Sequence, residues 1–161
     1  MRSHVNYDIV DGVGTITFYD EKSNSLPALT LKVLSETIRY LADDDTVQVI
    51  VLKSQGERAF CAGASFDELT AIQNEKEGKA FFMGFANVIN AMRKCPKFII
   101  GRVQGKAVGG GVGMAASVDF CLATKYASVK LSELAIGIGP FVVGPAVQRK
   151  LNLSGDRKSV V

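Results

Sequence analysis

The chain has 161 residues, of which 47% are hydrophobic and 22% are charged, enough for one globular domain with a buried core. Its formal net charge of +3 is small, and its Lys and Arg residues are scattered, which argues against a nucleic-acid-binding protein. The most apolar stretch, residues 98–118, is interrupted by Arg102 and Lys106, and residues 1–8 lack the apolar core of a signal peptide, so we expect neither a membrane-spanning segment nor secretion.

Histidine and cysteine usage narrows the chemistry that the chain can support. The single histidine, His4, lies in a polar N-terminal stretch where we expect a solvated side chain, so neither a histidine-dependent hydrolase nor a histidine metal site is expected. Cys61, Cys95 and Cys121 are odd in number and form no Cys-x-x-Cys pair, which predicts reduced thiols in a cytoplasmic protein that binds no metal. Acid-base chemistry must therefore come from carboxylates.

The first half of the chain predicts a hairpin followed by a strand-helix-strand unit. Residues 13–18 alternate threonine with large apolar side chains, as a half-buried strand does, and residues 7–10 are the expected hairpin partner. Pro27 suits the first position of a helix that we expect to stop before the acidic residues 43–45, because these oppose the helix dipole. One face of this helix carries Leu31, Leu34, Ile38 and Leu41.

The next segments extend this pattern. Residues 47–52 are nearly all apolar and mostly β-branched, which is typical of a parallel strand covered on both faces. A helical stretch is expected from about Phe66, and a second amphipathic helix should stop at Cys95 and Pro96. We interpret the apolar face of this second helix as core; it carries Phe81, Phe82, Phe85, Val88, Ile89 and Met92.

The last part of the chain predicts three more strands and a glycine-rich connection. The strands are expected at residues 97–103, 119–123 and 127–131, with the glycine-rich run at residues 105–113 after the first of them. The repeated alternation of strands and helices indicates an α/β fold with much parallel pairing.

Two glycine-bearing loops are candidate ligand sites. Residues 60–66 and 108–113 each lie between an apolar strand and a helical segment, where free backbone N–H groups collect. Such groups can hold an anion or a developing oxyanion. For either loop alone, tight turns and close helix-sheet packing are the commoner use of glycine.

A dinucleotide site is a weaker interpretation of the second loop. Residues 111–116 match the pattern Gly-x-Gly-x-x-Ala, with Glu133 downstream as a ribose ligand. The first glycine of that fingerprint should directly follow its strand, whereas Gly111 lies well past Val103. The phosphate-loop pattern also fails, because Lys106 is followed by alanine rather than by serine or threonine.

Three ordered motifs carry a more specific resemblance. Residues 59–69 read A-F-C-A-G-A-S-F-D-E-L, residues 105–111 read G-K-A-V-G-G-G, and residues 132–140 read S-E-L-A-I-G-I-G-P, followed by Q-R-K-L at residues 148–151. They resemble the crotonase motifs A-F-x-A-G-A-D-I/L-x-E-L/M, G-x-A-x-G-G-G, P-E-x-x-x-G-L/I-x-P and Q-R-L. Order and separation also agree. The chain is therefore similar to the crotonase (enoyl-CoA hydratase/isomerase) superfamily over nearly all of its length.

The resemblance implies both a fold and a site. The fold is an α/β crotonase (ClpP-like) spiral of ββα units, with residues 1–151 as its core and residues 152–161 as an atypical polar tail, without the family's C-terminal helices. The N–H groups of Ala64 and Gly110 would form an oxyanion hole for a CoA thioester, and Glu133 would be the acid-base carboxylate. The implied substrate-binding residues are Ala62, Ala64, Ser65, Phe66, Asp67, Gly110 and Phe141.

Departures from the motifs bear on the reaction. Family hydratases carry a second glutamate two residues after the G-G-G run, and Gly113 occupies that position here. A single carboxylate suffices for a 1,3-proton shift, so the sequence favours isomerase-like chemistry. Ser65 replaces the usual aspartate, and F-V-V-G at residues 141–144 replaces the more common G-A-G-G, which changes the acyl pocket.

Two hypotheses follow. The first is an acyl-CoA enzyme, an enoyl-CoA hydratase or isomerase of lipid or branched-chain acid breakdown, with no cofactor beyond the CoA of its substrate, and with neither a nucleic acid nor a membrane as partner. If the full family fold is present, it assembles as a trimer or a dimer of trimers. The second is a catalytically impaired acyl-CoA-binding or assembly protein, suggested by Gly113 and by the expected lack of C-terminal helices.

Overall fold

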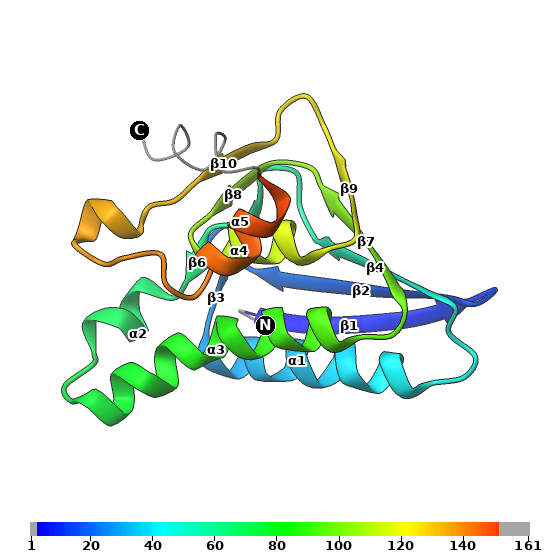
Figure 1. The fold of residues 1–161 in the computed structure, drawn as a ribbon, viewed down its shortest axis with the longest axis horizontal. Coiled ribbons are helices and arrows are strands. Elements are labelled where there is room, and N and C mark those ends of the chain that lie inside the picture. The colour runs from blue at the N-terminus through cyan, green and yellow to red at the C-terminus, as the bar shows by residue number, and fades with distance from the viewer. Residues whose placement is uncertain (1–2, 152–161) are drawn as a thin grey trace.

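The computed structural model describes residues 3–151, which form a mixed α/β structure around one large sheet and two small ones (Figure 1). The large sheet has the strand order β1-β2-β4-β7-β9, and only its first pair is antiparallel. Its strands are β1 (Ser3–Val10), β2 (Val13–Asp20), β4 (Val49–Ser54), β7 (Phe98–Val103) and β9 (Phe120–Ala123).

Both small sheets are parallel and lie where the glycine loops begin. One has the order β10-β8-β5 and the other pairs β3 with β6. Their strands are β3 (Ser25–Leu26), β5 (Ala59–Cys61), β6 (Gly63–Ala64), β8 (Lys106–Val108) and β10 (Ser128–Lys130).

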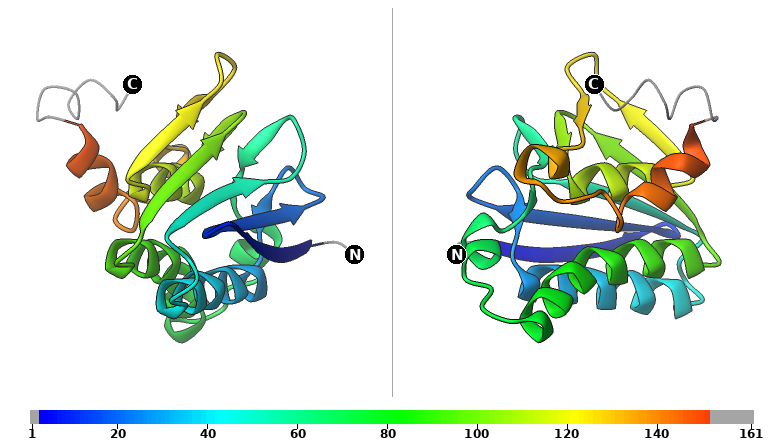
Figure 2. Two further views of the ribbon diagram at one scale, coloured as in Figure 1. Left: turned by 90° about the vertical axis from the view of Figure 1, so that its right-hand side faces the viewer. Right: turned by 60° about the vertical axis from the view of Figure 1, so that its left-hand side comes forward.

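Two long helices pack side by side against one face of the large sheet, as the views from different sides show (Figure 2). They are α1 (Ala28–Asp43) and α3 (Glu75–Lys94). The shorter elements are α2 (Phe66–Thr70), α4 (Gly110–Ser117), the 3-10 helix η1 (Glu133–Ile136) and α5 (Gly144–Lys150).

The core lies between the large sheet, the two long helices and β5. The sheet contributes Ile16, Phe18, Ile50 and Leu52, which are all buried. The rings of Phe18 and Phe60 meet edge to face with centroids 5.3 Å apart, and this contact joins the large sheet to β5. Because β5 leads directly into the first glycine loop, the core fixes the position of that loop.

Most of the expected elements are present. The hairpin pairs Val10 with Val13, and β2, α1 and β4 form the predicted parallel unit. Pro27 is the N-cap of α1 rather than its first residue, and the helix includes the first residue of the acidic run, Asp43. The expectation that β4 is covered on both faces was wrong: Ile50, Leu52 and Ser54 are buried, whereas the alternate side chains are only partly buried, because the long helices pack on one face. The predicted polar tail lies outside the described residues.

Candidate active site

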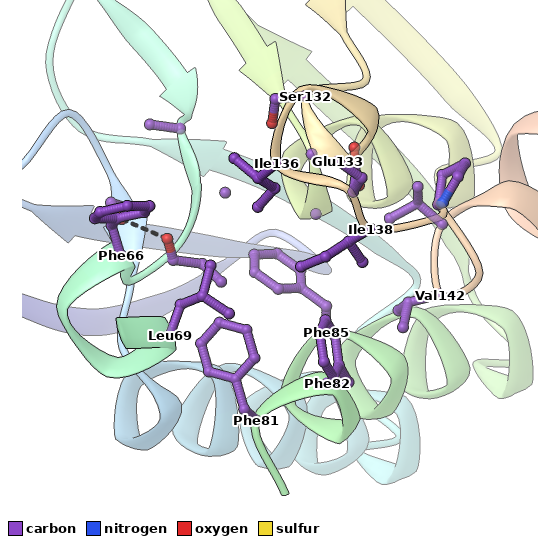
Figure 3. Close-up of a pocket in the computed structure, with 18 of the residues that line it drawn as sticks. Phe66, Leu69, Phe81, Phe82, Phe85, Ser132, Glu133, Ile136, Ile138 and Val142 are labelled. Atoms are coloured by element: carbon purple, nitrogen blue, oxygen red, sulfur yellow. Dashed lines mark hydrogen bonds between the residues drawn. The ribbon is translucent and has the colours of Figure 1, made fainter. Parts of the chain in front are cut away.

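An apolar cavity of about 320 Å³ lies where the two glycine loops meet (Figure 3). Side chains of α2 and α3 form one wall, and the segment that begins with η1 forms the opposite wall. The loop residues at its edge are Ala62, Gly63, Ala64, Gly109 and Gly110, and the side chains that line it include Phe66, Leu69, Phe81, Phe82, Phe85, Ser132, Glu133, Ile136, Ile138 and Val142.

The main chains of the two loops are in contact at Gly63. Its φ of +96° lies in the left-handed region that favours glycine, and a Cβ added there would lie 3.1 Å from the carbonyl oxygen of Val108 and 3.8 Å from the nitrogen of Gly110. A side chain at this position would therefore separate β6 from the start of α4. Gly63 allows Ala64 and Gly110 to border the same space.

Ala64 and Gly110 both line this cavity. Ala64 belongs to β6, and the N–H groups of Ala62 and Ser65 on either side of it donate to the carbonyls of Asn24 and Leu26, both at 3.2 Å. Gly110 is the first residue of α4, and the first N–H groups of a helix have no intrahelical acceptor. The two residues that the motifs single out as oxyanion donors therefore border one cavity, one from each loop.

Glu133 supplies the acidic group of the site. It is the first residue of η1, and a Cβ added at Gly109 would lie 3.5 Å from its Oε1. Its Oε2 is buried and has no hydrogen-bond partner among the described residues. A buried carboxylate oxygen without a donor is rare in folded proteins and marks a position where a ligand or substrate group would complete the bonding.

Hydrogen bonds from Asn24 anchor the first glycine loop. It is buried, and its Nδ2 donates to the carbonyl oxygens of Gln55 at 3.0 Å and Ala59 at 2.8 Å. The carbonyl of Asn24 accepts from the N–H of Ala62 at 3.2 Å, and the neighbouring Ser25 Oγ donates to the carbonyl of Ala64 at 2.9 Å. The loop that carries Ala64 is thus hydrogen-bonded to Asn24 and to Ser25, the first residue of β3.

The model of the enoyl-CoA hydratase/isomerase family matches residues 8–157. The chain belongs to this family. Its fold is the crotonase fold: a solved enoyl-CoA hydratase from Mycobacterium smegmatis superimposes with a TM-score of 0.90 at 28% identity, covering 100% of this chain and 62% of that one. A crotonase-type structure from Legionella pneumophila gives a TM-score of 0.90 at 31% identity, with 98% and 61% covered.

Curated relatives have different acyl substrates in their names. The short-chain-enoyl-CoA hydratase of Clostridium acetobutylicum is 32% identical over 150 residues, which cover 92% of this chain and 57% of that protein. The mitochondrial methylglutaconyl-CoA hydratase of Mus musculus is 32% identical over 117 residues, covering 73% and 37%. The chain therefore spans little more than half the length of these relatives, or less.

Gly113 occupies the position where family hydratases carry a second glutamate, and it is closely packed. It is buried in α4, and a Cβ there would lie 2.7 Å from Val143 Cγ1 and 2.8 Å from Ile89 Cδ1. The space that a longer side chain would need is already filled by apolar groups from α3 and the start of α5. Among the described residues that line the cavity, Glu133 is the one ionisable side chain.

Three expected substrate-binding residues do not line the cavity. Ser65 Oγ caps α2 by accepting from the N–H of Glu68 at 3.4 Å, and Asp67 pairs with Lys22. Phe141 is 85% exposed and is not among the lining residues, whereas Val142 and Val143 line the cavity. The structure brings the other predicted residues together: Ala62, Ala64, Phe66, Gly110 and Glu133.

The prediction that all the apolar residues of this helix face belong to the core was wrong for Phe81 and Phe82. Phe85, Val88, Ile89 and Met92 are buried as expected, but Phe82 is 38% exposed and Phe81 is only partly buried, and both line the cavity. At about 100° per helical residue, Phe81, Phe82 and Phe85 fall within one arc of about 100°, the width of an ordinary core-facing helix stripe. The sequence therefore carried no signal that distinguishes a cavity wall from a core face at these positions.

The cysteines do not supply a nucleophile to this site. Burial raises the pKa of the Cys61 thiol to about 12, and burial also raises the pKa of Cys95 and of Cys121. Each thiol is therefore less ionised than an ordinary cysteine near neutral pH.

No cluster of three or more His, Cys, Asp or Glu side chains in residues 3–151 is arranged to bind a metal ion. None of the helices in this part of the chain combines the length and apolar character that crossing a bilayer requires.

Proposed function

We propose that the cavity binds an acyl-CoA thioester, that the N–H groups of Ala64 and Gly110 hold the thioester oxygen, and that Glu133 transfers a proton. The observation that carries this proposal is the buried, unpartnered Oε2 of Glu133 beside the two glycine loops. Family membership supports the acyl-CoA class of ligand. Coenzyme A is then part of the substrate, and no separate cofactor takes part.

The reaction that fits a single carboxylate is the shift of a double bond in an enoyl-CoA. Glu133 accepts a proton from C2 of a 3-enoyl-CoA, and the electron pair of the C–H bond delocalises through the thioester carbonyl as a dienolate. The two N–H groups stabilise the negative oxygen, because they are fixed donors at the edge of an apolar cavity. Glu133 then returns the same proton to C4, which gives the 2-enoyl-CoA and restores the carboxylate.

Gly113 favours isomerisation over hydration. Addition of water to a 2-enoyl-CoA benefits from a second carboxylate that orients the water molecule, and the neighbourhood of Gly113 is filled by Val143 and Ile89. Two of the curated relatives are named as hydratases, so the assay includes a 2-enoyl substrate and measures hydration as well.

The test is to incubate the full chain with 3-hexenoyl-CoA and with 2-hexenoyl-CoA, and to identify the products by chromatography and mass. We expect interconversion of the two enoyl esters, with little 3-hydroxyacyl-CoA. Glu133→Gln should lower turnover at least about 10²-fold while acyl-CoA binding is retained, because general acid-base groups contribute about 10²–10⁴-fold. Glu57→Gln, at an exposed glutamate, is the matched control.

Each alternative result has a clear meaning. A wild-type turnover rate in Glu133→Gln would remove this residue from the mechanism. Saturable binding of acyl-CoA with no conversion of either ester would identify the chain as a catalytically impaired acyl-CoA-binding protein. Products that carry added water would assign hydration.

Three broader features complete the proposal. We place the reaction in fatty-acid or branched-chain acid breakdown in the cytoplasm, and we expect a homo-oligomer, either a trimer or a dimer of trimers. Light scattering coupled to size-exclusion chromatography would measure the assembly, and a monomeric mass at micromolar concentration would contradict it.

A further inference from the structure

The side chains that line the cavity determine which acyl groups can bind there. We infer that the cavity selects an acyl chain that is uncharged along its whole length, and that it rejects acyl groups with a distal carboxylate. This inference rests on the proposed binding of an acyl-CoA and adds the substrate class to it.

The side chains opposite the loops are apolar on both sides of the cavity (Figure 3). Phe81, Phe82 and Phe85 project from α3, and the rings of the first two meet edge to face with centroids 5.2 Å apart. Phe85 is nearly fully buried, so it forms a fixed surface. The facing wall consists of Ile136, Ile138 and Val142.

No positive side chain is available to pair with a second carboxylate. The cavity-lining residues among the described part of the chain include neither lysine nor arginine. Ser25 lines the cavity, but its hydroxyl already donates to the carbonyl of Ala64. A carboxylate moved from water into such surroundings loses its hydration without gaining an ion pair, which is strongly unfavourable.

Glu133 adds to this effect. Among the described residues of the lining it is the one ionisable group, it is acidic, and its buried Oε2 accepts no hydrogen bond from them. A dicarboxylic acyl group would bring a second negative charge into the same low-dielectric space, and like charges there repel strongly. The apolar side chains and Glu133 therefore both disfavour the binding of an acyl group with a distal carboxylate.

The experiment compares two saturated thioesters of equal chain length, hexanoyl-CoA and adipoyl-CoA, by isothermal titration calorimetry with the full chain at neutral pH. Neither ester can undergo the proposed isomerisation, so the measurement reports binding alone. We expect adipoyl-CoA to bind at least tenfold more weakly than hexanoyl-CoA. In the variant Phe82→Arg we expect this ratio to fall at least fivefold, because the guanidinium supplies the missing partner. Phe98→Arg is the matched control, because Phe98 is also an exposed phenylalanine but lies on β7 outside the cavity.

The outcomes separate the two proposals. Equal affinity for both esters, or tighter binding of adipoyl-CoA, overturns the inference and leaves the proposed function in place. If neither ester binds more tightly than free coenzyme A, the acyl site itself is wrong and both proposals fail. The comparison in the wild-type chain decides the inference even if Phe82→Arg does not fold.

Discussion

The ring of Phe85 lies directly against Gly110, so that a Cβ added at Gly110 would stand 2.5 Å from both Cγ and Cδ2 of the ring. Real Cβ atoms do not approach other heavy atoms so closely, and Phe85 is nearly fully buried, so the ring has little room to move. The contact links the aromatic wall of the cavity to one of the two proposed oxyanion donors. The position of the Gly110 N–H therefore depends on a side chain from another helix.

Gly110→Ala should impair both stability and turnover. We expect a loss of about 1–3 kcal/mol in the free energy of unfolding, the usual cost of overpacking a core. We expect kcat to fall by up to about 10²-fold, because displacing a catalytic donor by about 1 Å has effects of that size. Urea denaturation and the isomerase assay measure the two effects. In a Phe85→Leu background the same substitution should cost less; an unchanged cost would show that the ring is not the obstacle.

Gly113→Ala and Gly144→Ala form a matched pair within one chain. A Cβ at Gly113 meets Val143 and Ile89, whereas a Cβ at Gly144 meets nothing within 4 Å. We expect Gly113→Ala to destabilise the fold by about 1–2 kcal/mol, because the clash with the stiff, β-branched Val143 exceeds the gain in helix propensity. Gly144→Ala should be neutral or slightly stabilising. Equal denaturation midpoints for the two variants would contradict the packing argument.

Local sequence patterns predicted much of the fold. The alternation at residues 13–18 and the apolar helix face of Leu31 and Ile38 gave the hairpin and the first parallel unit, because their signals repeat within a few residues. The bounds of β4 and its partial burial were missed, because they depend on which face of the sheet the long helices cover.

The site was predictable only in part. The two glycine loops indicate free N–H groups, but the expectation that Ala64 and Gly110 share one site came from the family resemblance and not from spacing. The roles of Phe81 and Phe82 were missed because the same helical period describes a core face and a cavity wall. The Asn24 contacts span 31 and 35 residues in sequence, and no local pattern predicts them.

Asn24→Ala should destabilise the fold and disturb the first loop together. The side chain bonds to three backbone groups in a buried place: the N–H of Asp20 and the carbonyls of Gln55 and Ala59. Leaving such groups unpaired should lower the free energy of unfolding by about 2–3 kcal/mol. Asn24 also has a φ of 58°, so Asn24→Gly, which tolerates this conformation, isolates the contribution of the side-chain bonds.

Thermal denaturation of these variants separates the two causes. Asn24→Gly should recover only the backbone part of the loss, and Asn6→Ala, at an exposed asparagine of β1, should leave the midpoint unchanged. A wild-type midpoint in Asn24→Gly would mean that the three hydrogen bonds contribute nothing to stability.

Cys61 should make the stability of the fold sensitive to alkaline pH. Burial raises its pKa from 9.0 to about 12, so the folded chain keeps the thiol proton where the unfolded chain releases it. The stabilising effect is fully present below pH 9 and is lost as the pH rises from 9 towards 12, with a slope of up to about 1.4 kcal/mol per pH unit. Other groups titrate in this window, so the measurement is the difference between the wild type and Cys61→Ala in urea denaturation at pH 8, 9 and 10. We expect the gap to narrow as the pH rises, and Cys121→Ala, at an exposed cysteine, to show a much smaller change. A constant gap between the wild type and Cys61→Ala would show that the thiol ionises in the folded chain as readily as in the unfolded one.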